Sequence, residues 1–304
     1  MSFKCGIVGL PNVGKSTLFN ALTNSNKAQA ANFPFCTIDP NIGVVSVPDY
    51  RLENLAKISN SKKIVPTTIS FVDIAGLVKG ASKGEGLGNK FLSHIREVDA
   101  VIHMIRCFDS CDIQNVNPTI DPVRDLEIIE TEMKLADLES IQKRLEKNNK
   151  KNIDEDQVKI LQNSLDLINN DQDLANLKSN FSKKQLNLSG LLSLKPKIFV
   201  CNVDEKSIQN GNDYTKLFVE KFGLENTLIV SADIENQINE LNINERKNYM
   251  EMIGLKDTGL DMLIQKGYKI LELDTFFTSG PEETRAWTIQ KRCLAPEAAG
   301  EIHT

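Results

Sequence analysis

Eight consecutive residues near the start of the chain have the composition of a phosphate-binding loop. Gly9-Leu10-Pro11-Asn12-Val13-Gly14-Lys15-Ser16 matches the pattern G-x-x-x-x-G-K-[ST]. In such a loop the glycines let backbone N–H groups curve around phosphate oxygens. We expect Lys15 to be solvated until it pairs with the β- and γ-phosphates, and the Ser16 hydroxyl to ligate Mg²⁺. Apolar alternation over residues 3–9 and helical spacing from Lys15 predict the flanking strand and helix.

Two further segments follow in the order that phosphate-loop domains use. Residues 65–74 read as an apolar strand that ends in Asp73-Ile74-Ala75-Gly76, a D-x-x-G motif. Asp73 is predicted to hold Mg²⁺ through water, and the Gly76 N–H to sense the γ-phosphate. Between the two motifs, Thr37 is the natural threonine for Mg²⁺ and γ-phosphate, although a loop threonine can equally be an ordinary turn residue.

The second half of the chain supplies a predicted base-binding side. Residues 100–106 and 197–201 read as two more apolar strands. The second strand runs into Asn202-Val203-Asp204-Glu205, where GTPases carry N-K-x-D, and Ser231-Ala232 resembles the short loop that packs beside the base. This order predicts an α/β fold with a parallel, doubly wound sheet and nucleotide at the carboxyl ends of its strands.

The residues at the N-K-x-D position favour ATP over GTP. Valine occupies the lysine position at Val203, and Glu205 occupies the aspartate position with one more methylene. Guanine would then lose an aligned bidentate acceptor for its N1–H and N2 amine, a loss of roughly 1–3 kcal/mol. Asp204 lies one residue early and offers an alternative acceptor after a small backbone shift.

The stretch between Asp73 and Asn202 is longer than two βα units require, and the excess has helical periodicity. A polar segment, residues 148–152, separates two apolar series, which predicts an antiparallel coiled-coil hairpin. Two amphipathic helices packed on the sheet are the alternative. The series are Leu126, Ile129, Met133, Ala136, Leu138, Ile141 and Leu145, then Val158, Leu161, Leu165, Ile168, Leu174, Leu177 and Phe181. We expect deletion of residues 123–181 to spare nucleotide binding, and a projecting arm to serve a macromolecular partner.

Composition places few further constraints on function. The chain has 304 residues, 40% hydrophobic and 25% charged residues, and a net charge of −5, as soluble globular proteins have. Its first 120 residues are slightly basic, which suits a polyanionic ligand. Six cysteines without a C-x-x-C pattern indicate core thiols in a reducing compartment rather than disulfides or zinc ligands. No signal peptide or 18-residue apolar run is evident, so we expect a cytoplasmic protein without a membrane partner.

Four long segments together resemble the YchF family of Obg-like ATPases. They are GIVGLPNVGKSTLFN at 6–20, ANFPFCTI at 31–38, DIAGLVKGASKGEGLGN at 73–89 and FFTSGPEETRAWTI at 276–289, and the similarity covers essentially the whole chain. The resemblance implies a ribosome-associated ATPase with a Ras-like phosphate-loop domain, an inserted coiled-coil arm and a C-terminal β-grasp TGS domain. The implied limits are 1–275 for the nucleotide-binding domain, 122–190 for the arm within it, and 276–304 for an incomplete TGS domain.

The resemblance also assigns roles to individual residues. It implies that Asn12, Val13, Gly14, Lys15, Ser16 and Thr17 cradle the phosphates. Ser16 and Thr37 then ligate Mg²⁺, and Val203 lies against the base. The resemblance also implies that Asn202 and the backbone beside Val203 meet the adenine N6 amine and its neighbouring acceptor. Glu205, Ser231 and Ala232 are the other residues predicted beside the base. In one departure, Ile113-Gln114-Asn115-Val116 has asparagine where family members commonly have histidine, which removes a candidate catalytic group.

These observations predict an Mg²⁺-dependent ATPase that binds ATP and the ribosome, through ribosomal RNA or protein of the large subunit, and has no DNA partner. The alternatives are an Obg-class GTPase in ribosome assembly and a nucleotide-gated binding module with negligible turnover. A metabolic kinase would need an acceptor pocket, for which the sequence gives no signal.

Leu77 replaces the glutamine that orients water in Ras-like GTPases, so intrinsic hydrolysis should be slow. The Asn12 side chain either holds a K⁺ ion beside the phosphates or bonds its own backbone.

Overall fold

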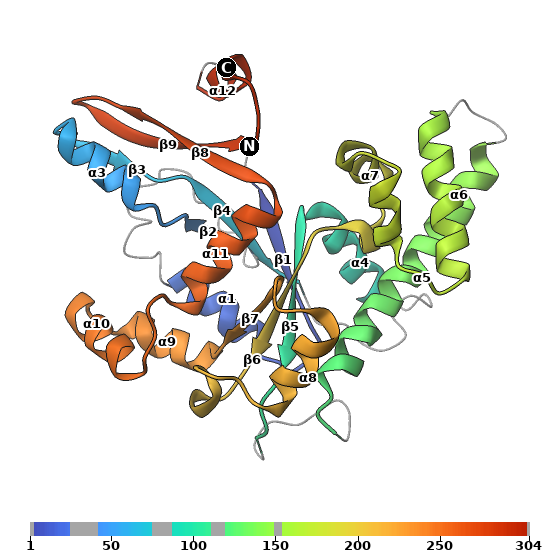
Figure 1. Cartoon of the computed structure of the whole chain (residues 1–304), viewed down its shortest axis with the longest axis horizontal. Coiled ribbons are helices and arrows are strands. Elements are labelled where there is room, and N and C mark those ends of the chain that lie inside the picture. The colour runs from blue at the N-terminus through green and yellow to red at the C-terminus, as the bar shows by residue number, and fades with distance from the viewer. Residues whose placement is uncertain (1–2, 25–41, 75–86, 111–118, 149–153, 303–304) are drawn as a thin grey trace.

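A computed structural model of the chain describes residues 3–24, 42–74, 87–110, 119–148 and 154–302. Its centre is a six-stranded sheet with the order β2-β4-β1-β5-β6-β7 (Figure 1). The strands are β1 (Lys4–Val8), β2 (Ile42–Ser46), β4 (Thr68–Asp73), β5 (Ala100–Arg106), β6 (Lys197–Asn202) and β7 (Thr227–Val230). The strands predicted at 100–106 and 197–201 are therefore confirmed, and the one predicted at 65–74 corresponds mainly to β4.

Five of these strands run parallel, as the sequence predicts, and β2 is the exception. It lies antiparallel to β4 at the sheet edge, with Val44 opposite Ser70. The parallel strands are short apolar runs because both faces of a doubly wound sheet are covered. All seven residues of β5 are buried, including His103 and Arg106. The carboxyl ends of β1, β4, β5 and β6 consequently meet at one edge.

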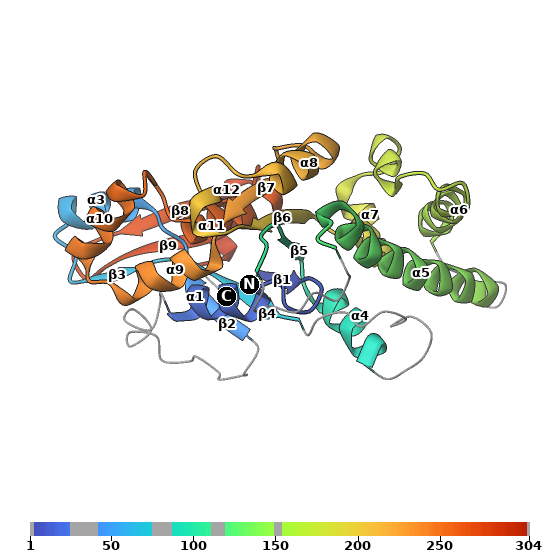
Figure 2. The ribbon, with the colours of Figure 1, turned by 90° about the horizontal axis from the view of Figure 1, so that it is seen from below.

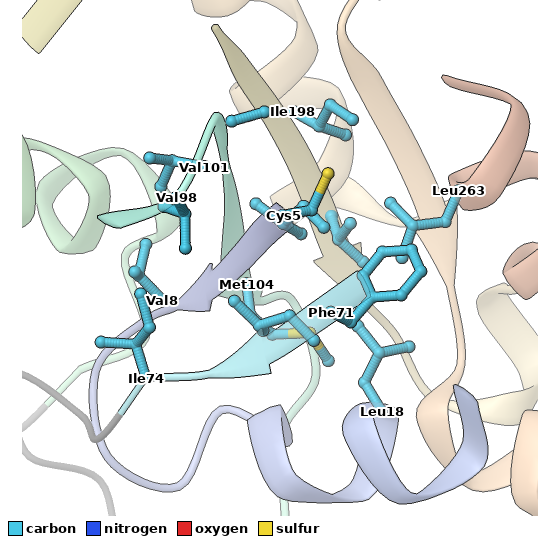
Figure 3. Close-up of a cluster of buried hydrophobic side chains, with 14 of the residues drawn as sticks. Cys5, Val8, Leu18, Phe71, Ile74, Val98, Val101, Met104, Ile198 and Leu263 are labelled. Atoms are coloured by element: carbon cyan, nitrogen blue, oxygen red, sulfur yellow. The ribbon is translucent and has the colours of Figure 1, made fainter. Parts of the chain in front are cut away.

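Helices cover both faces of the sheet (Figures 1 and 2). Figure 1 shows α1, α9 and α11 on one side and α4 and α5 on the other. Side chains from both sides meet the strands in one apolar cluster, in which Leu18 of α1 and Leu263 of α11 approach Phe71 (Figure 3). The helices are α1 (Lys15–Asn24), α3 (Tyr50–Ile58), α4 (Leu87–Glu97), α5 (Pro122–Asn148), α6 (Glu155–Asn169), α7 (Lys183–Ser189), α8 (Asp213–Phe222), α9 (Ala232–Glu240), α10 (Ile243–Met252), α11 (Gly259–Ile270) and α12 (Ala295–Gly300). None of the helices in the described ranges has the length and apolar character needed to span a bilayer.

The inserted region is an antiparallel pair, α5 and α6, but only part of it is independent of the sheet. Ile129, Met133 and Ala136 of α5 are buried in the central core cluster. The prediction that they belong to the seam of a free arm is therefore wrong, and the alternative of helices packed on the sheet holds for this half of α5. Deleting residues 123–181 would remove core side chains, so the expectation that this deletion spares the nucleotide site loses its basis.

The outer half of α5 has its own apolar contacts. Ile141 packs with Leu161 of α6 and with Leu191 in a separate cluster. After α6 the predicted seam ends, because residues 174–179 form a 3₁₀ helix, η2 (Leu174–Ser179), and α7 follows. Leu174 and Leu177 pack on the other side of α6, beside Ile160. The arm is thus a small helical unit rather than a two-helix hairpin with one continuous seam.

A buried carboxylate fixes the root of this arm. Both Asp137 oxygens accept backbone hydrogen bonds of 2.8 Å, from the N–H groups of Leu192 and Ser193. These residues begin a second short 3₁₀ helix, η3 (Leu192–Leu194), which leads into β6. Burial raises the pKa of Asp137, and the two backbone N–H groups act against that shift. The arm therefore departs from a fixed position beside β6.

The C-terminal segment and β3 together form a second, three-stranded sheet with the order β3-β9-β8. β8 (Leu273–Ser279) and β9 (Glu283–Gln290) make an antiparallel hairpin, and β3 (Lys63–Val65) joins β9 in parallel. β8 begins at Leu273, three residues before the predicted boundary at 276. Short hydroxyl contacts fasten the hairpin, including Ser61 Oγ to Thr284 Oγ1 at 2.7 Å. The hairpin is thus joined to the strand that precedes β4.

Two matched truncations should separate the arm from the core. Met133→Ala and Leu161→Ala each remove a fully buried side chain. Each should lower the stability of the cluster in which the side chain packs by about 2–5 kcal/mol. Met133→Ala should lower the free energy of global unfolding, whereas Leu161→Ala should raise hydrogen exchange in α6 and leave β1 and β5 protected. Loss of protection in β1 from Leu161→Ala would show that the arm and the sheet form one cooperative unit.

Candidate functional site

The phosphate-binding loop between β1 and α1 requires unusual backbone geometry. Asn12 and Gly14 both have positive φ, 63° and 99°. A Cβ atom on Gly14 would lie 2.5 Å from Asn202 Nδ2, and one on Gly9 would lie 2.6 Å from the Met104 carbonyl oxygen. Both glycines of the predicted motif are therefore needed for close approach between the loop and the strands beneath it. The loop then enters α1, where the Leu18 N–H donates to the Gly14 carbonyl at 2.9 Å.

Lys15 is held inside this loop. Its side chain is buried, and Nζ donates to the Leu10 carbonyl oxygen at 2.8 Å. Burial lowers the pKa of Lys15, and the nearby charge of Asp73 acts against that shift. The expectation that the ammonium is solvated without a ligand is therefore wrong. The bond to Leu10 instead holds the ammonium where the loop curves, ready to exchange a carbonyl for phosphate oxygens.

Ser16 and Asp73 come together where α1 begins and β4 ends. The Ser16 hydroxyl donates to Asp73 Oδ2 at 3.1 Å. Burial raises the pKa of Asp73, while Ser16 and the Lys15 ammonium lower it. A hydroxyl and a partly desolvated carboxylate fit a hard divalent cation such as Mg²⁺, which prefers oxygen ligands and retains several waters. No group of three or more His, Cys, Asp or Glu side chains suited to a metal occurs in the described part of the chain. The predicted ligand Thr37 lies outside the described residues, and water and phosphate oxygens would supply further ligands.

Asn202 connects the phosphate-binding loop to the predicted base-binding side. Its side-chain Nδ2 donates to the Val13 carbonyl at 2.9 Å, and its Oδ1 accepts from the Ala232 N–H at 3.0 Å. The residue is 5% exposed. Both ends of the amide thus bind protein backbone. The structure shows Asn202 as a clamp between two loops, a role additional to the base contact predicted from sequence.

The other predicted base-side residues occupy different environments. The Val203 side chain is buried in an apolar cluster with Cys107 and Phe218, and its backbone N–H donates to the Val230 carbonyl at 2.9 Å. Neither its side chain nor that N–H is therefore free to face a base. Glu205 is exposed at the start of a 3₁₀ turn, η4 (Glu205–Ser207). Ser231 and Ala232 are buried where α9 begins.

Several predicted site residues lie outside the described residues. Thr37 and Gly76 are among them, as are Leu77 and Asn115. Thr17 lies in the first turn of α1, one residue after Ser16. The described part of the site is therefore the phosphate-binding loop, Asp73 and the base side.

Two supporting residues have no motif that could identify them from sequence. Met104 of β5 lies under the loop, with its side chain 3.3 Å from the position of a Gly14 Cβ. Glu235 of α9 is fully buried, and its Oε1 accepts from the Gly259 N–H at 2.7 Å where α11 begins. Glu235 is three residues beyond Ala232, so it ties the helix of the base-side loop to α11.

This arrangement of loop, helix, carboxylate and clamp, at the carboxyl edge of a mostly parallel sheet, defines a phosphate-loop nucleoside triphosphatase. Comparisons with known proteins narrow the class. A family model described as a 50S ribosome-binding GTPase matches residues 4–129, and the model of the YchF-type GTPase C-terminal domain matches residues 273–304.

Relatives that match along essentially the whole of this chain identify the family. The chain is 47% identical over 312 residues to the ribosome-binding ATPase YchF of Escherichia coli O157:H7, covering 100% of this chain and 85% of the relative. Identity to the protein of the same name from Bacillus subtilis is 46% over 316 residues, covering 100% and 86%. The solved structure of the Schizosaccharomyces pombe YchF GTPase superposes with a TM-score of 0.84 at 36% identity, covering 99% of this chain and 84% of that one. The chain belongs to the YchF family.

Glu235 should make stability depend on pH. Burial is the main cause that raises its pKa from 4.5 to about 7. A carboxyl whose pKa is higher in the folded state stabilises the fold most at pH values below 4.5, and this contribution is lost as pH rises towards and through 7. Glu235→Gln keeps an acceptor for the Gly259 N–H but cannot titrate, so it should flatten the fall of the unfolding free energy with rising pH. Urea unfolding between about pH 5 and 8, a range that spans the raised pKa of Glu235, measures this change. An unchanged slope would mean that Glu235 does not titrate in this range.

Proposed function

We propose that the protein is an Mg²⁺-dependent ATPase that associates with the ribosome as a translation-linked switch. The observation that carries the nucleotide chemistry is the preformed pair of Ser16 and Asp73 beside the buried ammonium of Lys15. Mg²⁺ bound there would neutralise charge on the phosphates, while Lys15 exchanges its bond to Leu10 for one to phosphate. Thr37 and Gly76 are proposed to complete the γ-phosphate side.

Ribosome association is proposed from the relatives. The E. coli and B. subtilis relatives are named ribosome-binding ATPases, and the family that matches residues 4–129 is described as a 50S ribosome-binding GTPase. The large subunit is accordingly the proposed partner, through ribosomal RNA or protein, and the cytoplasm the proposed location. The segments around Thr37 and residues 73–89 are proposed to toggle with hydrolysis, as they do in other phosphate-loop switches.

The base side supports ATP over GTP. An N-K-x-D lysine packs its stem over guanine, whereas here that position is Val203 and its side chain is buried in the core. Both ends of the Asn202 amide bind protein backbone, so we propose the exposed carboxylate of Glu205, in place of Asn202, as the acceptor for the adenine N6 amine. Backbone beyond Val203, whose own N–H is bonded to Val230, would meet the neighbouring acceptor. The two oxygens of a glutamate displaced by one methylene match the paired guanine donors poorly, which leaves guanine donors unsatisfied.

Calorimetric titration with ATP, GTP and their diphosphates in Mg²⁺ buffer tests this preference. We expect ATP to bind about five- to a hundredfold more tightly than GTP. Glu205→Ala should narrow that ratio, and Lys15→Ala should abolish binding of both triphosphates while the fold is retained. Equal or tighter binding of GTP by the wild-type protein would contradict the proposal.

Two other functions remain testable alternatives. The S. pombe relative is named a GTPase and the matching family is described as a GTPase, which favours an Obg-class GTPase in ribosome assembly as the second candidate. A nucleotide-gated binding module with negligible turnover is the third, and single-turnover hydrolysis distinguishes it from an enzyme.

Hydrolysis by the isolated protein should be slow and faster in K⁺ than in Na⁺. Leu77 has no group to orient the attacking water. A monovalent cation held by the Asn12 side-chain oxygen would offset charge that develops on the transferring phosphoryl group. The positive φ of Asn12 marks a constrained place in the loop. Steady-state rates in matched K⁺ and Na⁺ buffers, with and without ribosomes, measure both effects. A fast rate in Na⁺, unchanged by ribosomes or by Asn12→Ala, would require another water-positioning group.

A further inference from the structure

The proposed base-reading residue, Glu205, lies on a loop that leaves the sheet. The loop runs from Asp204, after β6, to Gly211, before α8. The residue before the loop is fixed to the sheet, because the Val203 N–H donates to the Val230 carbonyl at 2.9 Å. Glu205 itself is exposed, and no hydrogen bond fixes its carboxylate in the described part of the structure. Within the loop, Ile208 is buried in the apolar cluster and Gln209 Nε2 donates to the Ile253 carbonyl at 2.6 Å. The path of the backbone at Glu205 depends on these contacts and on the anchor at the far end of the loop.

Asn212 supplies that anchor, and its amide serves two purposes. Its Oδ1 accepts from the Thr215 N–H at 3.1 Å, which caps α8. Its Nδ2 donates to the Cys107 carbonyl oxygen at 2.7 Å and reaches Ser207 Oγ at 3.4 Å. The first bond belongs to the helix alone. The second crosses 105 positions in sequence to the end of β5.

The contact with Cys107 connects the end of the Glu205 loop to Asn202 at its start, through the residue that follows β5. The Cys107 N–H donates to the Asn202 carbonyl at 2.8 Å, and the Asn202 side chain clamps the phosphate-binding loop. Through Cys107, Asn212 fixes the Glu205 loop to the same strand ends that carry the phosphate site. The turn just before it is also restricted, because Gly211 has a φ of 68° and a Cβ there would lie 2.3 Å from Thr215 Oγ1.

We propose that Asn212 is a positioning residue for nucleotide-base selection, which rests on the proposed reading of adenine by Glu205. Asn212 contacts no base. Its bond to Cys107 ties the backbone of the loop that carries Glu205 to the end of β5. Without that bond the loop keeps its helix cap and the contacts of Ile208 and Gln209, but it loses one tie to the strand end beside the phosphate-binding loop. ATP then loses an aligned acceptor, whereas GTP, which Glu205 serves poorly, loses little.

Asn212→Asp separates the two purposes of the side chain. Aspartate still accepts from the Thr215 N–H as a helix cap, but it has no N–H to donate to Cys107. Asn212→Ser provides a second, uncharged cap without that donor. Asn242→Asp is the matched control, because Asn242 caps α10 by accepting from the Glu245 N–H at 3.0 Å and makes no bond to β5 among its described contacts. Affinities for ATP and GTP and thermal midpoints are measured for all three variants.

We expect Asn212→Asp and Asn212→Ser to weaken ATP binding about three- to tenfold, the effect of one hydrogen bond. GTP affinity should stay near wild type, and Asn242→Asp should change neither affinity. The thermal midpoint should fall by only about 2–4 °C in the Asn212 variants, because the Cys107 carbonyl loses one donor. An unchanged ratio of ATP to GTP affinity in both Asn212 variants would overturn the inference, as would an equal loss for both nucleotides together with a larger fall in the midpoint. A wild-type protein that does not distinguish the two nucleotides would instead refute the proposed ATP preference, and with it this role.

Discussion

The amide of Asn202 is the interaction on which the geometry of the site depends. The phosphate-binding loop and the predicted base-binding loop leave different strands of the sheet. Asn202 donates to one and accepts from the other, at 2.9 and 3.0 Å, in a buried setting where an unmade bond is costly. Gly14 is needed partly because the amide occupies the place that its side chain would take. The residue types at Gly14, early in the chain, and at Asn202, late in the chain, therefore depend on each other.

The elements that position this site could be predicted well because they are local and strongly patterned. The loop motif fixes Lys15 and Ser16 at the start of a helix, and continuous apolar runs identify β5 and β6. The order of motifs along the chain then orders the strands. The antiparallel direction of β2 could not be predicted, because a five-residue edge strand has no pattern that encodes its direction.

The arm shows where periodicity alone fails. Leu126 to Ala136 and Ile141 to Leu145 repeat with the same spacing on one long helix, yet the first group packs on the sheet and the second on α6. Apolar spacing states which face of a helix is buried and not what covers it. Lys15 shows a similar limit, since a sequence does not reveal that its ammonium already has a carbonyl partner. Residues such as Met104 and Glu235 act only through contacts with distant elements.

The pairing of β3 with β9 has a consequence for the order of folding. The two strands are separated by about 220 positions, and Lys62 reaches Glu282 across that gap. During synthesis the central sheet can close once β7 has emerged, whereas β3 waits with an unpaired edge until the hairpin is made. The nascent chain therefore passes through a stage in which the domain that holds nucleotide is complete and the exposed edge of β3 is still open to other strands.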